Sequence, residues 1–173
     1  NQGIEACIDD QMTVHQSQTL DRLNEVFAEV IEWYLVNGGN PDEVSTRPYW
    51  TIFNYTWWEN HMKNDDLLRQ KVALALSEIF VISIESNLSD AGFGLADYYD
   101  ILLKHSFGNF EDMLREISLH PCMGYYLSHL NNPREIPEEN IHSDENYARE
   151  IMQLFTIGLY ELNQDGSRKT DGQ

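Results

Sequence analysis

The residues best able to do chemistry gather between positions 142 and 153. His142, Glu145 and Glu150 offer one imidazole and two carboxylates, which are donors that a divalent metal accepts. Glu145 and Glu150 stand five residues apart, however, and on a helix they diverge instead of sharing a face one turn apart. His120 or His129 would have to complete the shell. The spacing therefore supports a metal site less well than a structural network of these side chains.

The same segment fits two other interpretations. Glu145 and Glu150 could act as general acid and base beside Arg149, in a hydrolase-like enzyme with or without a metal. Alternatively, Asn146, Arg149 and Glu150 form a structural polar network. Arg149 lies one helical turn after Glu145 and can pair with it. Because positions 149 and 150 flank an apolar face, we expect both side chains to be buried, with Arg149 bonded to a carboxylate and to backbone carbonyls.

The helix that carries these side chains is expected to begin after Ser143 and to end before Gly158. In residues 159–173, apolar and polar side chains then alternate before an Asp-Gly turn, which predicts a small β-hairpin. Asn163 and Asp165 also resemble the start of a calcium-binding loop. No Glu follows at the twelfth position, so a plain turn is preferred.

Helical periodicity recurs through most of the rest of the chain. An apolar stripe from Leu20 to Tyr34 is the clearest amphipathic helix. After Pro48 come three tryptophans within nine residues, expected mostly in the core, with a sugar-stacking platform as the functional alternative. Residues 67–83 are apolar on most sides and predict the central helix. Residues 1–16 show little periodicity and are expected to be irregular.

These patterns predict an all-α protein. We expect a single domain over residues 1–173, with six to eight helices and the small C-terminal hairpin. The chain has 173 residues, 42% of them apolar, which is enough for one hydrophobic core. No internal repeat and no second domain is evident.

The charge balance excludes some partners. Asp and Glu number 29 against 11 Lys and Arg, a net charge of −18. So few basic residues cannot form a continuous track along a phosphate backbone, so we expect no nucleic-acid binding. The longest apolar run, residues 72–84, is too short to span a bilayer, which predicts no membrane insertion. The acidic excess is most simply a solvated surface.

Cys7 and Cys122 are too few for a disulfide framework. In an oxidising compartment they could form one disulfide, and otherwise they are two idle thiols. The chain contains no phosphate-binding loop, dinucleotide fingerprint or nucleophile elbow. The sequence therefore requires no cofactor, and it specifies no oligomeric state.

Four segments carry a family resemblance: LRQKVALALSEIFVIS at 68–83, YYDIL at 98–102, FGNFEDML at 107–114 and DENYAREIMQLF at 144–155. In order and spacing they resemble a bacterial family called domain of unknown function 1800, over roughly residues 45–173. The resemblance implies export to the periplasm or beyond. It also implies a partner from the domain of unknown function 1501 family, which is often encoded beside it.

Two differences from that family bear on function. The chain ends where the family pattern continues, so we expect an N-terminal portion of a longer protein. Many relatives have Trp-His and Asn-His-Phe where this chain has Leu76-Ser77 and Glu78-Ile79-Phe80. This departure weakens any mechanism through histidines in that segment.

No arrangement of nucleophile, base or ligands therefore exceeds a structural explanation. We expect a non-catalytic helical scaffold or interaction module of an exported bacterial protein. The alternative is a metal-assisted or carboxylate acid/base enzyme that uses the polar face at residues 142–153.

Overall fold

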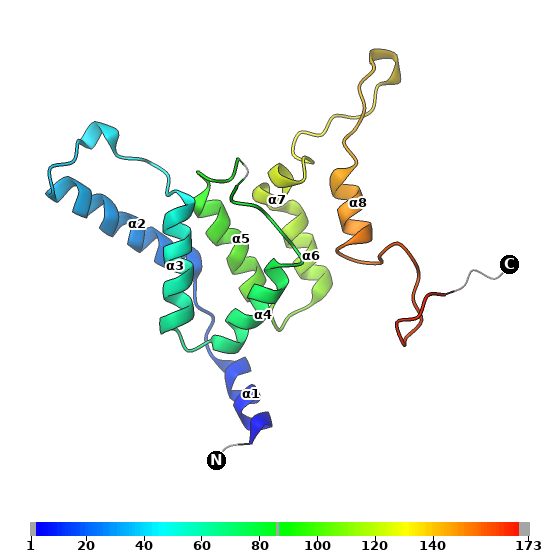
Figure 1. The fold of residues 1–173 in the computed structure, drawn as a ribbon, viewed down its shortest axis with the longest axis horizontal. Coiled ribbons are helices and arrows are strands. Elements are labelled where there is room, and N and C mark those ends of the chain that lie inside the picture. The colour runs from blue at the N-terminus through cyan, green and yellow to red at the C-terminus, as the bar shows by residue number, and fades with distance from the viewer. Residues whose placement is uncertain (1–2, 86, 170–173) are drawn as a thin grey trace. The chain divides into compact units, whose positions relative to one another are not determined.

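A computed structural model describes residues 3–85 and 87–169 of the chain (Figure 1). The chain divides into two compact units, Asn1–Tyr126 (unit 1) and Leu127–Gln173 (unit 2). The described residues form eight α-helices and two short 3₁₀ helices, and the prediction of an all-α fold is confirmed. Unit 1 contains α1 (Ile4–Thr13), α2 (Thr19–Val36), η1 (Pro41–Glu43), α3 (Trp50–Lys63), α4 (Leu67–Ser77), α5 (Gly92–His105), α6 (Phe110–Leu119) and α7 (Pro121–Tyr126). Unit 2 contains η2 (Pro137–Glu139) and α8 (Asn146–Gln153).

The centre of unit 1 is α5, which packs against α2, α3, α4, α6 and α7. Its buried residues face several sides, as a helix surrounded by others requires. Small residues let its neighbours approach closely: a Cβ on Gly92 would lie 2.5 Å from the backbone oxygen of Pro48, and one on Gly94 would lie 2.6 Å from Cys122 Sγ. The predicted central helix at 67–83 is therefore wrong in place and in length. α4 ends at Ser77, and the chain then runs without helix through the buried Phe80.

The start of α2 is held by carboxylates from other helices. Its N-cap residue Gln18 provides no side-chain cap. Instead, the Asp100 carboxylate of α5 accepts hydrogen bonds from the backbone N–H of Thr19 (2.7 Å) and Leu20 (2.9 Å). Asp66, just before α4, accepts bonds from the backbone N–H and the hydroxyl of Ser17, both at 2.9 Å. Burial raises the pKa of Asp100, and the two backbone bonds oppose that shift.

The N-terminal segment is more regular than predicted. Residues 1–16 were expected to be irregular, but Ile4–Thr13 form α1. Ile4, Cys7, Ile8 and Met12 recur at helical spacing, although no residue of this helix is buried. Gln11 ties the helix to α4: its amide donates to the Asp65 carbonyl and accepts from the Leu68 N–H, each at 3.1 Å.

Unit 2 is organised around α8. The predicted start after Ser143 is two residues too early, because Asp144 Oδ1 accepts from the Asn146 N–H at 2.8 Å while the Ser143 hydroxyl donates to the Pro133 carbonyl. The side chain of Asn132 bonds to both the backbone N–H and the carbonyl of Asp144, at 2.8 and 2.7 Å. These bonds fix the entry to the helix. The Gly158 N–H bonds back to the Met152 carbonyl at 2.9 Å, after α8 has ended.

The predicted β-hairpin at 159–173 is wrong. Through residue 169 the described chain contains no strand, and the segment has one isolated bridge, between Leu162 and Arg168. The turn itself is present, with Gly166 at a positive φ of 81° and its N–H bonded to the Asn163 carbonyl. Residues 159–169 are exposed, and two short strands with nothing packed on them are marginal in water. Residues 170–173 lie outside the described part.

None of the described helices has the length and apolar character needed to cross a bilayer. The prediction of no membrane insertion agrees with this finding.

Candidate functional site

Most of the polar residues predicted at 142–153 are exposed to solvent. Arg149 pairs with Glu145 at 3.7 Å, as the spacing indicated, but the Arg149 side chain is 58% exposed. The expected burial of Arg149 is wrong, and Glu150 is only half-buried. The reason is that α8 has no buried residue at all, and Met152 and Leu154 are themselves exposed. The helix thus has no buried face at whose margin Arg149 would lie.

The structure does not gather the metal candidates into one shell. His142 faces Glu135 at 3.4 Å, and neither Glu145 nor Glu150 joins them. His129 stacks near Tyr147 at a ring distance of 4.0 Å. Within residues 3–85 and 87–169, no three His, Cys, Asp or Glu side chains are placed to hold one ion.

The two cysteines are free in the structure. Cys7 is exposed on α1, which lies against α4, whereas Cys122 is buried in α7, which lies against α5 and α6. Because their helices pack on different neighbours, the disulfide considered from the sequence is not formed.

A second polar group resembles a catalytic arrangement but is structural. His120 Nε2 lies 3.1 Å from Asp97 Oδ2, and the Cys122 backbone N–H donates to His120 Nδ1 at 3.2 Å. Burial, with the nearby Asp97 charge, raises the pKa of the Cys122 thiol to about 11. A thiol with so high a pKa carries almost no thiolate at neutral pH and is a poor nucleophile. The bonds instead fix the start of α7 on α5.

The best-formed cavity of unit 1 is an aromatic pocket of about 320 Å³ between α3, α4, α5 and the segment after α4. None of its lining residues is charged. They are Phe53, Asn54, Trp57, Trp58, Leu74, Ser77, Phe80, Ile82, Ile84, Leu95, Tyr98, Tyr99 and Leu102. We call this set the aromatic pocket.

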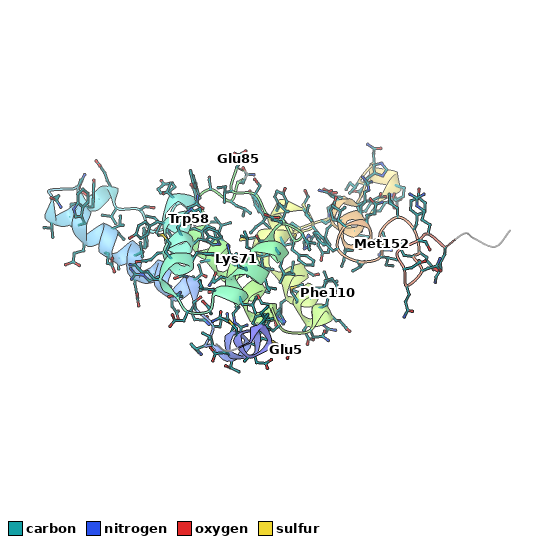
Figure 2. All side chains as sticks on the ribbon, turned by 60° about the horizontal axis from the view of Figure 1, so that its bottom comes forward. Glu5, Trp58, Lys71, Glu85, Phe110 and Met152 are labelled. Atoms are coloured by element: carbon teal, nitrogen blue, oxygen red, sulfur yellow. The ribbon has the colours of Figure 1, made fainter. Side chains whose placement is uncertain are left out.

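The rings of the aromatic pocket meet edge to face, which is the geometry that aromatic quadrupoles favour. Trp57 lies 4.9 Å from Trp58 and 6.2 Å from Tyr99, with interplanar angles of 88° and 73°. Trp58 is 60% exposed; Figure 2 labels its side chain on α3. The three tryptophans expected mostly in the core are therefore surface or lining residues: Trp50 is exposed as well, and Trp57 is half-buried.

Tyr99 lines the pocket, but its hydroxyl oxygen is not exposed to the cavity. The Tyr99 hydroxyl is buried and has no hydrogen-bond partner; the Trp57 indole lies toward it but falls short of bonding geometry. Burial raises the pKa of Tyr99 to about 12, so the phenol stays protonated at neutral pH. Tyr98, beside it, donates to the Phe80 carbonyl at 2.7 Å and fixes the segment after α4 against α5.

His61 backs the Trp57 ring at 3.7 Å, tilted by 31°. Its Nδ1 lies 2.8 Å from the Trp57 carbonyl, so Nδ1 carries the proton and the buried Nε2 is an unpartnered acceptor. Burial, the largest effect, lowers the pKa of His61 and favours the neutral ring. Trp57 thus packs against a neutral imidazole.

Sequence reasoning missed the aromatic pocket. The signal was present in part: Trp57 and His61 are four residues apart on one helix face, and Tyr98 and Tyr99 adjoin in a motif used only for family resemblance. No local sequence pattern indicates that α3, α4 and α5 pack around a cavity.

A family model with the description "Protein of unknown function (DUF1800)" matches residues 1–169. Neither the curated proteins nor the solved structures contain a significant match to the chain. The family match spans all three helices that line the pocket, and its description assigns no reaction.

Proposed function

The chain belongs to the DUF1800 family of proteins of unknown function, and for this member we propose a non-catalytic binding role. The aromatic pocket binds a small neutral molecule, or a side chain of a larger one, that carries a ring and one hydrogen-bond acceptor. The single observation that carries the proposal is an uncharged aromatic cavity of about 320 Å³, one of whose lining residues, Tyr99, has a buried hydroxyl without a hydrogen-bond partner.

The size and lining of the pocket support this choice. Ligand pockets span roughly 300 to 1,000 Å³, and a cavity of about 320 Å³ is at the small end of that range. Aliphatic residues such as Leu74 and Leu102 form the interior, while Trp58 stands at the exposed side. A charged ligand would lose its hydration without meeting an opposite charge, which disfavours ions.

Tyr99 supports the proposal that the ligand carries a hydrogen-bond acceptor. Leaving a buried hydroxyl unpaired costs about 1–3 kcal/mol, and a ligand oxygen in reach would recover part of that. Because Tyr99 remains protonated, it donates, so the matching ligand group is an acceptor such as a carbonyl or ether oxygen.

The lining also supports binding over catalysis. The lining set contains no nucleophile next to a base, and its polar members are Asn54, Ser77, Tyr98 and Tyr99. The Ser77 hydroxyl already donates to the Leu74 carbonyl at 2.7 Å. General acid–base work needs a group that titrates near the working pH, and Tyr99 does not.

The experiment compares two ring compounds of equal shape, acetophenone and isopropylbenzene, by tryptophan fluorescence and by NMR titration of the whole chain. We expect both to bind and acetophenone to bind more tightly. Tyr99→Phe should remove that preference, about tenfold for one lost hydrogen bond. Tyr125→Phe, an exposed tyrosine on α7, is the matched control and should keep it. The proposal fails if neither compound saturates the protein at millimolar concentration.

Two further parts of the proposal derive from the family resemblance: export by a bacterium, and binding of a protein of the domain of unknown function 1501 family. Fractionating native cells and co-purifying the two proteins from the same fraction tests both. Finding the chain in the cytosol would contradict export.

A further inference from the structure

The second half of α2 lies largely uncovered. Thr19, Leu23 and Val26 are the buried residues of this helix, and all belong to its first half. Beyond them the helix continues to carry apolar side chains, yet Trp33 is 67% and Val36 80% exposed. In Figure 1 this end of α2 and the turn after it extend away from α4 and α5.

Trp33 forms one side of a groove between α2 and α3. The groove measures about 450 Å³ and is lined by Val26, Val30 and Trp33 of α2 and by Ile52 and Tyr55 of α3, with Glu29 at its edge. We call it the α2–α3 groove. Val30, Trp33 and Ile52 also line a second hollow of about 260 Å³, so the apolar surface continues on toward η1.

Two carboxylates belong to this surface: Glu29 lines the groove, and Glu43 lines the neighbouring hollow. α2 and η1 carry six acidic residues and one basic residue, Arg22: the acids are Asp21, Glu25, Glu29, Glu32, Asp42 and Glu43. Arg22 is already engaged by Glu25 at 2.8 Å, by Glu29 at 3.2 Å and by Glu59 at 2.7 Å. No described residue forms an ion pair with Glu43. The Glu43 charge beside the groove therefore lacks a cationic partner within the described residues.

We propose that the α2–α3 groove docks an amphipathic helix of a partner protein, with an apolar face and flanking Lys or Arg residues. Apolar anchors on such a helix would cover Val30 and Trp33, and its basic residues would face Glu29 and Glu43. A second copy of this chain fits poorly, since each copy carries a net charge of −18 and the same two carboxylates. Anionic lipid is disfavoured by the same charge.

The test uses two synthetic 18-residue helical peptides with the same leucine face, one flanked by lysines and one by glutamates. Fluorescence anisotropy on the whole chain should show binding of the lysine peptide, and binding of the glutamate peptide at least tenfold weaker. Trp33→Ala should weaken binding of the lysine peptide at least tenfold. Trp58→Ala, an equally exposed tryptophan of the aromatic pocket, is the matched control and should change it less than twofold.

Each other outcome overturns the proposal. Binding of the lysine peptide that survives Trp33→Ala reflects general attraction to an acidic protein and removes the groove from the argument. Equal binding of the glutamate peptide removes the charge argument. A dimer in light scattering that Trp33→Ala dissociates would assign the groove to a second copy, and vesicle binding lost in Trp33→Ala would assign it to lipid. If the ring compounds fail to bind the aromatic pocket, this test still stands, because it measures peptide binding at the α2–α3 groove. Its control, Trp58→Ala, changes the aromatic pocket and leaves the groove intact.

Discussion

At the level of single residues, Glu59 of α3 joins α2 through Arg22 and also pairs with Lys63 on its own helix. Its carboxylate contacts Arg22 Nε at 2.7 Å and the Lys63 ammonium one turn along its own helix. The hydrogen bond from Arg22 is the largest influence, and with that from Lys63 it lowers the pKa of Glu59 to about 2. The side chain is 8% exposed and covered mainly by its own partners near the surface, so salt should weaken both pairs.

Glu59 predicts a stability loss in acid. Its pKa of about 2 in the folded chain is below the ordinary 4.5, so its contribution is complete above pH 4.5 and is lost as the pH falls toward 2. Glu59→Gln should lower the melting temperature at pH 7 and flatten the decline between pH 4.5 and 2. Glu111→Gln, whose pair with Arg115 is long and exposed, is the control. Parallel melting curves for wild type and Glu59→Gln would contradict the prediction.

The cysteines predict two different reactivities. Cys7 is exposed and should react at once with a thiol reagent. Cys122 is buried, with its pKa raised to about 11, and should react only when the protein unfolds. Counting thiols with and without denaturant measures both, and Cys7→Ser should abolish the fast phase. A native protein that shows no thiol until a reductant is added would instead establish the Cys7–Cys122 disulfide.

Arg149 shows which residue-scale statements a sequence supports. Its pairing with Glu145 follows from a spacing of four on a helix and was correctly expected. The burial of Arg149 depends on which residues pack over the helix, and the spacing of residues along the helix carries no information about that packing. Glu59 illustrates the converse: its long-range partner Arg22 could not be read from the local pattern.

The exposure of Arg149 changes the expected effect of its removal. Arg149→Ala should cost less than about 1 kcal/mol, as for other exposed pairs. Chemical denaturation measures the free energy of unfolding, with Arg22→Ala as the comparison that should lose clearly more, because it removes the partner of the largely covered Glu59. A loss of several kcal/mol for Arg149→Ala would show that the pair is covered in solution.

At the level of elements, the sequence predicts where helices lie more reliably than it predicts which helices pack against each other. The stripe from Leu20 to Tyr34 correctly predicted α2. The central position went to α5, which is less uniformly apolar than residues 67–83. Close packing at Gly92 and Gly94 decides this, and small residues leave no hydrophobic signal.

Gly92 predicts a measurable cost for one methyl group. In Gly92→Ala the new Cβ would meet the Pro48 carbonyl oxygen at 2.5 Å, and the Gly92 N–H that bonds to this oxygen at 3.0 Å would be displaced. We expect a loss of about 1–3 kcal/mol, as for other overpacked sites. Gly3→Ala, with no atom within 4 Å of the added group, should be nearly neutral in the same urea titration. Equal stability of the two variants would refute the close approach.

At the level of the whole molecule, buried apolar residues concentrate in unit 1. Among the described residues of unit 2, only Leu127 and Phe155 are apolar and buried. A sequence reveals fold class and charge, and both were correctly read here. The packing of α3 against α5 that opens the aromatic pocket depends on contacts distant in sequence, and so does the division into two units. A single domain over residues 1–173 stays a prediction.

The concentration of the core predicts that unit 1 folds alone. A fragment of residues 1–126 should retain a helical circular dichroism spectrum and a cooperative melt, because it keeps α5 and the helices that pack on it. A matched fragment ending at residue 105, which lacks α6 and α7, should melt at a lower temperature or fail to fold. Loss of cooperativity in the longer fragment would show that its core needs residues beyond 126.

The carboxylate that caps α2 has a consequence during protein synthesis. Asp100 follows the two amides that it caps, those of Thr19 and Leu20, by 81 and 80 residues. A growing chain therefore releases the first turn of α2 from the ribosome long before the group that completes it is translated. Until Asp100 emerges, that turn is left to water or to chaperones, and the helix that begins the bundle becomes one of the last to be finished at its N-terminal end.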